Sequence, residues 1–269
     1  MTRHHNSTRD HLSSRRVPSL KLAVVVTCAA LFVAASWPRV FVSHSQTLGA
    51  QQLQDYRTRP GERFDEIVRS DFFAGMMGDE TRLERGMKYC EAVLSKNPKH
   101  AEALVWHGGG LLTRAAHAYT KGASALGDRL WDQGLKEMDD AVAYEPDNMG
   151  VMIGRAATLI GLAQSGWDSA DPRARQLLSS AVTDYEKVYR LQRPTFSALS
   201  NHSRGELLFG LASGWSMLGD QKRAREYLRL VLQDCRGTSY ETEAQGWLKK
   251  APIAVVQHDC TGCHVSKGY

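Results

Sequence analysis

Prolines recur at a fixed interval in this sequence. Pro98, Pro146 and Pro194 stand 48 residues apart, and each follows an apolar stretch with helical periodicity. Proline lacks a backbone N–H and clashes with the preceding turn, so it ends a helix. The three stretches are residues 87–96, 135–144 and 182–191. Helices that stop at regular intervals predict an all-α domain of repeated helix pairs, which bury their apolar faces by stacking.

Small and apolar residues in the last unit have the spacing of a helix–turn–helix. They are Leu208, Leu211, Ala212, Trp215, Gly219, Ala224, Leu228 and Val231. An earlier unit, ending at Pro98, places Phe73, Ala74, Met77, Gly86, Cys90 and Val93 in the same register. This pattern resembles the tetratricopeptide repeat (TPR), a unit of 34 residues. The resemblance implies a stacked helical solenoid over residues 64–250, whose inner groove binds a helix or an extended segment of another protein.

The 48-residue spacing exceeds the repeat length, so we expect additional residues around 119–130 and 166–173. Gly219 and Asp220 predict the turn between two helices, and residues 241–249 predict a terminal cap on the last pair. Four side chains on the apolar stripes are expected in the core, namely Cys90, Met138, Trp215 and Leu228. We also expect Cys90 and Cys235 to be free buried thiols, because they lie in distant units.

Positive charge is concentrated at the N-terminus. The chain has a net charge of +5, and residues 1–21 contain five basic residues against the single acid Asp10. The remaining residues are therefore nearly neutral, which argues against a nucleic-acid-binding body. We interpret residues 1–21 as the cytoplasmic end of a targeting segment.

An uncharged apolar stretch, residues 22–37, follows this basic segment. It forms either a membrane anchor over residues 22–42 or a signal peptide that is cleaved after the small residues Ala34 and Ala35. Residues 43–63 are then a linker. Both interpretations predict a protein of the bacterial inner membrane with the bulk of the chain in the periplasm, or an exported one if the leader is cleaved.

The tail, residues 251–269, contains the pattern C-x-x-C-H at Cys260, Cys263 and His264. This pattern resembles the haem attachment site of c-type cytochromes, and the resemblance covers the motif alone. It implies one covalent haem c, with Cys260 and Cys263 forming the thioethers and His264 binding the iron. A reducible dithiol and a zinc site that includes His258 are alternatives. The sixth iron ligand is left open among four histidines, His100, His107, His117 and His202.

No catalytic motif is found, so we do not expect an enzyme, and no small-molecule substrate is identified. The sequence lacks H-E-x-x-H and G-x-S-x-G, and Gly108 to Gly110 lie in a helical pattern, where they predict close packing or a kink instead of a phosphate-binding loop. The expected function is a membrane-anchored, periplasm-facing scaffold for protein–protein interaction that carries a haem as an accessory to electron transfer. The alternatives are a TPR assembly factor like those of cytochrome c maturation, and a plain TPR adaptor; both lack haem.

Overall fold

The computed structural model describes residues 63–164 and 172–255. The chain divides into two units, Met1–Ser43 and His44–Tyr269, and every described residue belongs to the second. The expectations for residues 1–62, which include the membrane segment, lie outside the described residues. Within the described ranges all regular elements are helical, which confirms the all-α prediction. No described helix has the length and apolarity needed to cross a bilayer.

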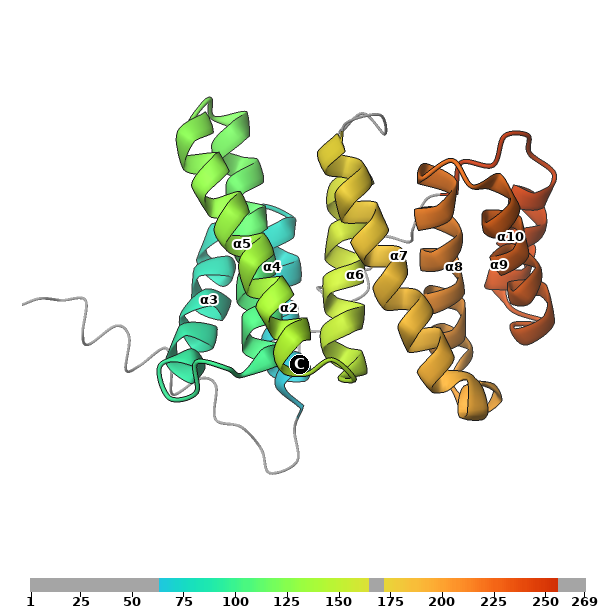
Figure 1. The fold of residues 1–269 in the computed structure, drawn as a ribbon, viewed down its shortest axis with the longest axis horizontal. Coiled ribbons are helices and arrows are strands. Elements are labelled where there is room, and N and C mark those ends of the chain that lie inside the picture. The colour runs from blue at the N-terminus through green and yellow to red at the C-terminus, as the bar shows by residue number, and fades with distance from the viewer. Residues whose placement is uncertain (1–62, 165–171, 256–269) are drawn as a thin grey trace, which may run out of the picture. The chain divides into compact units, whose positions relative to one another are not determined.

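The helices follow one another as antiparallel pairs (Figure 1). Their bounds are α2 Phe64–Met76, α3 Glu80–Leu94, α4 Ala101–Thr120, α5 Ser124–Tyr144, α6 Met149–Gln164, α7 Pro172–Gln192, the 3₁₀ helix η1 Arg193–Ala198, α8 Asn201–Met217, α9 Gln221–Asp234 and α10 Ser239–Leu248. Each pair packs along its length, and the first helices α2, α4, α6 and α8 also contact one another in order. Successive pairs therefore share one continuous series of first helices.

The same kind of turn joins the two helices of the first pair, α2 and α3, and those of the last pair, α8 and α9. Gly78 and Gly219 have φ angles of 100° and 87°, which an L-residue with a Cβ adopts only with strain. An aspartate follows each glycine and caps the next helix: Asp79 accepts a hydrogen bond from the backbone N–H of Arg82, and Asp220 accepts one from Arg223. The predicted turn at Gly219 and Asp220 is confirmed.

The additional residues of the second unit lengthen its helices. Helices α4 and α5 have 20 and 21 residues and meet at a turn around Gly122. The other expected insertion, residues 166–173, falls mostly outside the described residues. Helices α3, α5 and α7 end at Leu94, Tyr144 and Gln192, shortly before the three regularly spaced prolines, as predicted.

Several residues on the predicted repeat stripe are partly buried or exposed, among them Met77 and Trp215. Met77 caps α2 and is 65% exposed, because the helix ends one residue earlier and the chain turns away at Gly78. Trp215 is only partly buried; its indole N–H donates to Glu186 and its ring stacks against Arg223. The polar edge of the indole keeps it at the border of the core.

The other core predictions are confirmed. Met138 and Leu228 are buried, and Cys90 and Cys235 are free buried thiols. Helix α10 packs on α9, as expected of a cap, although it begins at Ser239 and ends at Leu248. A Cβ atom on Gly108 would lie 2.7 Å from the backbone oxygen of Gly134, so the glycine allows α4 and α5 to pack backbone against backbone.

Candidate functional site

The residues predicted to bind haem, Cys260, Cys263 and His264, lie outside the described residues. Their roles as thioether and iron ligands stay predictions. The described part of the chain ends at Val255, five residues before Cys260. The structure therefore describes how the fold holds the segment that leads into the motif.

This segment follows α10 and lies against the core. Ile253 and Val255 are each 2% exposed, whereas Ala254 between them is exposed. Alternating burial with a period of two is the pattern of an extended chain whose successive side chains point to opposite sides. Both buried side chains belong to the main hydrophobic cluster, together with Ile160 and Phe209.

The carboxamide of Gln221 binds both the backbone N–H and the carbonyl oxygen of Ile253. The backbone N–H of Ile253 donates to Gln221 Oε1 at 2.7 Å, and Gln221 Nε2 donates to the Ile253 carbonyl oxygen at 3.0 Å. Gln221 is the first residue of α9. Its side chain therefore takes the place of a neighbouring β-strand for one residue of the segment.

Two serines of α8 bind the next main-chain groups. The backbone N–H of Val255 donates to Ser216 Oγ at 3.1 Å, and Ser213 Oγ donates to the Val255 carbonyl oxygen at 3.0 Å. Gln164, the last residue of α6, donates to Ser213 Oγ at 2.9 Å. A longer contact of 3.4 Å joins Ser216 Oγ to the Ile253 carbonyl oxygen.

The local sequence explains why these groups meet. Ser213 and Ser216 are three residues apart, so they lie on the same face of α8. Both are buried, and a buried hydroxyl without a partner costs about 1 to 3 kcal/mol. The main chain of the segment supplies hydrogen-bond partners for the two hydroxyls, and the hydroxyls supply partners for its N–H and carbonyl groups. We call Gln164, Ser213, Ser216 and Gln221 the tail clamp.

The tail clamp recognises main-chain groups and two apolar side chains. The hydrogen bonds from Gln221, Ser213 and Ser216 to the segment all involve the N–H or the carbonyl oxygen of residues 253 and 255. The Ala254 side chain is exposed, so the clamp imposes no requirement on it. Arg225 secures the preceding connection by donating to the carbonyl oxygens of Leu248 and Lys250, at 3.0 and 2.8 Å. The site is therefore built to hold an extended segment with apolar residues at alternate positions.

Sequence reasoning missed the tail clamp. The available signal was the pair Ser213 and Ser216 on the buried side of an otherwise apolar and glycine-rich helix. Buried hydroxyls that lie one turn apart need partners, and a helix whose own backbone is already bonded cannot supply all of them. Their partners lie about forty residues later in the chain, where no short motif marks them.

Substituting Gln221 tests the clamp. Gln221→Ala removes the donor and the acceptor that hold Ile253, so we expect the backbone amides of Ile253 and Val255 to exchange with deuterium at least about ten times faster. Gln233→Ala is the matched control, since Gln233 lies exposed on the same helix. Equal exchange in the two variants would show that the carboxamide does not hold the segment.

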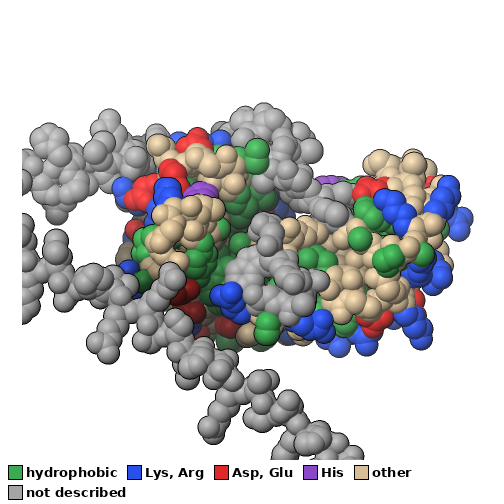
Figure 2. All heavy atoms as spheres, turned by 90° about the horizontal axis from the view of Figure 1, so that it is seen from above, with side chains coloured by type: hydrophobic (Ala, Val, Ile, Leu, Met, Phe, Trp, Pro, Cys, Tyr) green, Lys and Arg blue, Asp and Glu red, His purple; other side chains and the backbone are tan. Residues whose placement is uncertain are grey.

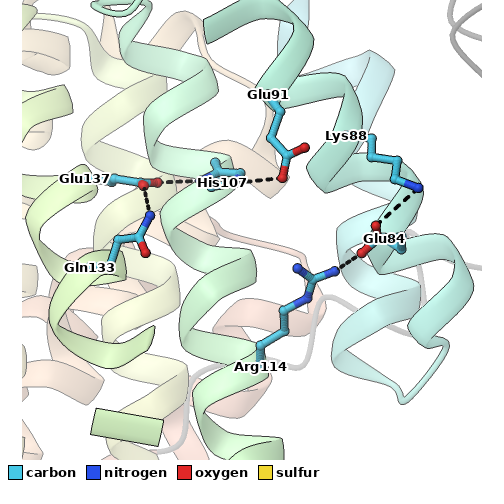
Figure 3. A network of polar contacts seen from close by, with 7 residues as sticks. All are labelled: Glu84, Lys88, Glu91, His107, Arg114, Gln133 and Glu137. Carbon is cyan, nitrogen blue, oxygen red and sulfur yellow. Dashed lines mark hydrogen bonds and ion pairs between the residues drawn. The ribbon is translucent and has the colours of Figure 1, made fainter. Parts of the chain in front are cut away.

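A second polar network joins helices α3, α4 and α5 (Figure 3). The Nδ1 atom of His107 lies 2.5 Å from Glu137 Oε2, its Nε2 atom lies 3.6 Å from Glu91 Oε1, and Gln133 donates to Glu137 at 2.9 Å. Carboxylates thus occupy both sides of the buried imidazole. This arrangement ties three helices together and disfavours His107 as the sixth iron ligand.

The same figure shows a neighbouring ion cluster on α3 and α4. Glu84 accepts from Arg114 and lies 3.3 Å from Lys88. Partial burial raises the pKa of Glu84, but the hydrogen bonds and charges of Arg114 and Lys88 outweigh burial and lower it overall. The cluster is a structural link between the first two helix pairs.

The other three candidate histidines also have Nδ1 engaged. His100 accepts from the backbone N–H of Ala103 at 3.2 Å, His117 lies 2.6 Å from Glu80, and His202 lies 2.9 Å from the hydroxyl of Tyr240. Iron could therefore be reached only through Nε2. The described residues contain no group of three or more histidine, cysteine or acidic side chains able to hold a metal ion.

No protein-family model, curated protein or solved structure matches this chain. Its function is therefore inferred from its own residues and their contacts.

Proposed function

We propose that this chain is a TPR-like scaffold that faces the periplasm from an N-terminal membrane segment and carries one c-type haem on its C-terminal tail. The observation that carries the proposal is the tail clamp. It holds the chain at Ile253 and Val255, shortly before the C-x-x-C-H motif, and this supports a body that presents the motif.

The order of helix contacts supports the TPR-like part. Four consecutive helix pairs share a continuous series of first helices, and α10 covers the last pair. Stacking of this kind buries the face that one pair alone leaves open, and it makes a long surface from the first helices. The turns at Gly78 and Gly219 repeat the same glycine–aspartate capping at the two ends of the series.

The distance from the clamp supports the haem part. A fully extended chain covers at most about 3.6 Å per residue, so Cys260 lies within about 18 Å of Val255 and His264 within about 32 Å. A haem attached there would be tethered to the helical body through at most nine residues beyond Val255. Burial raises the pKa of the Cys90 and Cys235 thiols, which makes them poor nucleophiles and leaves Cys260 and Cys263 as the reactive pair with the required spacing.

The mass of the purified chain tests this proposal. Produced in cells that attach c-type haem, the chain should gain the mass of one haem and show a visible spectrum that survives denaturation and extraction. Replacing both cysteines, Cys260→Ser with Cys263→Ser, should abolish the gain, because no thioether can form. A double variant of the buried thiols, Cys90→Ala with Cys235→Ala, is the control and should keep the haem.

Two results would contradict the haem. One is a colourless protein of unmodified mass from competent cells. The other is a reporter fused after Tyr269 that proves to be cytosolic, because haem is attached to this motif only on the far side of the membrane. The same mass spectrum also reports whether residues 1–35 have been removed.

The tail clamp also favours a second candidate, an assembly factor without haem of its own. Such a protein holds extended chain ends that contain C-x-x-C-H, and the clamp holds the extended segment just before that motif. In this case Cys260 and Cys263 should cycle between dithiol and disulfide. Thiol titration before and after reduction, with no porphyrin in the mass spectrum, would identify it.

A further inference from the structure

We propose that the tail clamp is a displaceable binding site, at which an extended segment of a partner protein replaces Ile253–Val255. The segment carries apolar residues at two alternate positions and an acidic residue three positions before the first of them. Partner binding and release of the tail are then a single event. The proposal rests on the scaffold part of the proposed function and is independent of the haem.

The hydrogen bonds show why an exchange is possible. They involve the main chain of residues 253 and 255, so any extended segment without proline at those positions offers the same donors and acceptors. The two pockets are filled by β-branched side chains, Ile253 and Val255. An apolar side chain of similar size fits each pocket at little cost.

The positive charge of Arg225 beside the clamp favours an acidic residue in the partner segment. Lysine and arginine side chains gather over the α8–α10 end of the described helices (Figure 2). Arg225 donates to the carbonyl oxygen of Lys250, which is three residues before Ile253, so a guanidinium lies beside this position of the segment. The Lys250 ammonium instead lies 3.8 Å from the centre of the Trp247 ring. A partner with glutamate in this place gains an ion pair that the tail lacks.

The open face of α6 gives a partner more surface than the clamp alone. Ile153, Ala157 and Gly161 precede Gln164 at helical spacing, so they continue its face away from the clamp. Ile153 is 39% exposed, and a Cβ on Gly161 would meet no described atom within 4 Å. The chain runs from Gln221 toward Gln164 between residues 253 and 255. We therefore infer that a partner segment that continues in this direction reaches the α6 face.

The tail has one advantage over any partner. It is attached to the site, and attachment through a short connection corresponds to an effective concentration in the millimolar range. A short free peptide therefore binds poorly to the intact chain. A partner succeeds through the ion pair at Arg225 and the contacts along α6, or after the tail has been pulled away.

The test measures binding of a fluorescent peptide with the sequence of residues 250–259 to three forms of the full chain. The first form is unchanged. The second carries Ile253→Asp and Val255→Asp, which expel the tail because a carboxylate cannot be buried in either pocket. The third adds Gln221→Ala and Ser216→Ala to the second. We expect the second form to bind at least about tenfold tighter than the first, and the third to lose that gain.

Peptide variants identify what the site recognises. A peptide with glutamate in place of Lys250 should bind the second form more tightly than the original, whereas one with proline at the positions of Ile253 and Val255 should not bind. A peptide extended by five residues of alternating isoleucine and serine should bind tighter still. Gly161→Arg should weaken binding of the extended peptide more than that of the short one, because the added residues contact the α6 face that contains Gly161.

Equal affinity of the first two forms for the peptide would overturn the proposal, as would binding that survives in the third form. Should the expelled-tail variant fail to fold, the intact chain gives the answer. Excess glutamate peptide must then accelerate deuterium exchange at the amides of Ile253 and Val255, and unchanged exchange refutes displacement. The haem content of the same preparations is recorded separately, so a chain without haem that releases its tail contradicts only the haem assignment.

Discussion

Asp184→Ala should lower the free energy of unfolding by roughly 3 to 5 kcal/mol, because it leaves a buried guanidinium without its main partner. Asp184 on α7 accepts two hydrogen bonds from Arg155 on α6, at 2.6 and 2.8 Å. Their side chains are only 4% and 11% exposed. Urea unfolding of the full chain, followed by circular dichroism, measures the loss.

Burial and the partner's charge shift the pKa of each member of this pair in opposite directions. Burial raises the pKa of Asp184, and the hydrogen bonds and charge of Arg155 offset only part of that effect. For Arg155, burial alone would lower the pKa, but Asp184 and Asp139 outweigh it and raise the pKa. We therefore expect the intact pair to contribute little net stability, although the loss of one member is costly.

A double variant separates these two statements. Asp184→Leu combined with Arg155→Met removes both charges and keeps apolar volume, so it should recover most of the stability lost in Asp184→Ala. Asp139→Ala is the control: Asp139 also accepts from Arg155 but is 72% exposed, and we expect a change within about 1 kcal/mol. An Asp184→Ala variant as stable as the wild type would show that Arg155 is not held by Asp184.

Arg155 and Asp184 also belong to a set of ion pairs that joins the second helix pair to the third. Arg155 contacts Asp139 on α5 as well as Asp184 on α7, and Lys187 on α7 reaches Asp147 and the carbonyl oxygen of Pro146 in the α5–α6 connection. The second and third helix pairs are thus joined by ion pairs on this side of the stack. Directional contacts of this kind fix how one pair sits on the next.

The helices were predictable because their ends depend on local chemistry. Pro98, Pro146 and Pro194 stop helices wherever they occur, and a glycine followed by aspartate makes a turn and caps the next helix. The two units that fit the repeat pattern contain such turns at Gly78 and Gly219. A residue's own backbone preferences determine these features, so one sequence is enough to locate them.

The tail clamp was not predictable in the same way. Its hydroxyls lie on α8 and its main-chain partners follow α10, and only the stacking of α8, α9 and α10 brings them together. In the same way, the periodicity that predicted Trp215 in the core does not reveal Glu186, whose carboxylate accepts from the indole and keeps it at the border of the core. The haem-binding role of Cys260, Cys263 and His264 stays a prediction from the motif.

Close packing of α4 against α5 leads to the other large expected effect. Gly108→Leu should lower the free energy of unfolding by more than about 3 kcal/mol, and Gly108→Ala by about 1 to 3 kcal/mol. A Cβ at this position would lie 2.7 Å from the backbone oxygen of Gly134 and 3.0 Å from Met138 Cγ. The backbone of α5 can move away only by opening the helix pair.

The sign of the alanine variant makes this a sharp test. Alanine in place of glycine within a helix normally adds about 0.5 to 1 kcal/mol, because it restricts the unfolded chain. Gly161→Ala on α6 should show that gain, since its Cβ would meet no described atom within 4 Å, whereas Gly108→Ala should lose stability. Thermal unfolding of both variants measures the difference, and a gain at Gly108 would mean that α4 and α5 are not in backbone contact there.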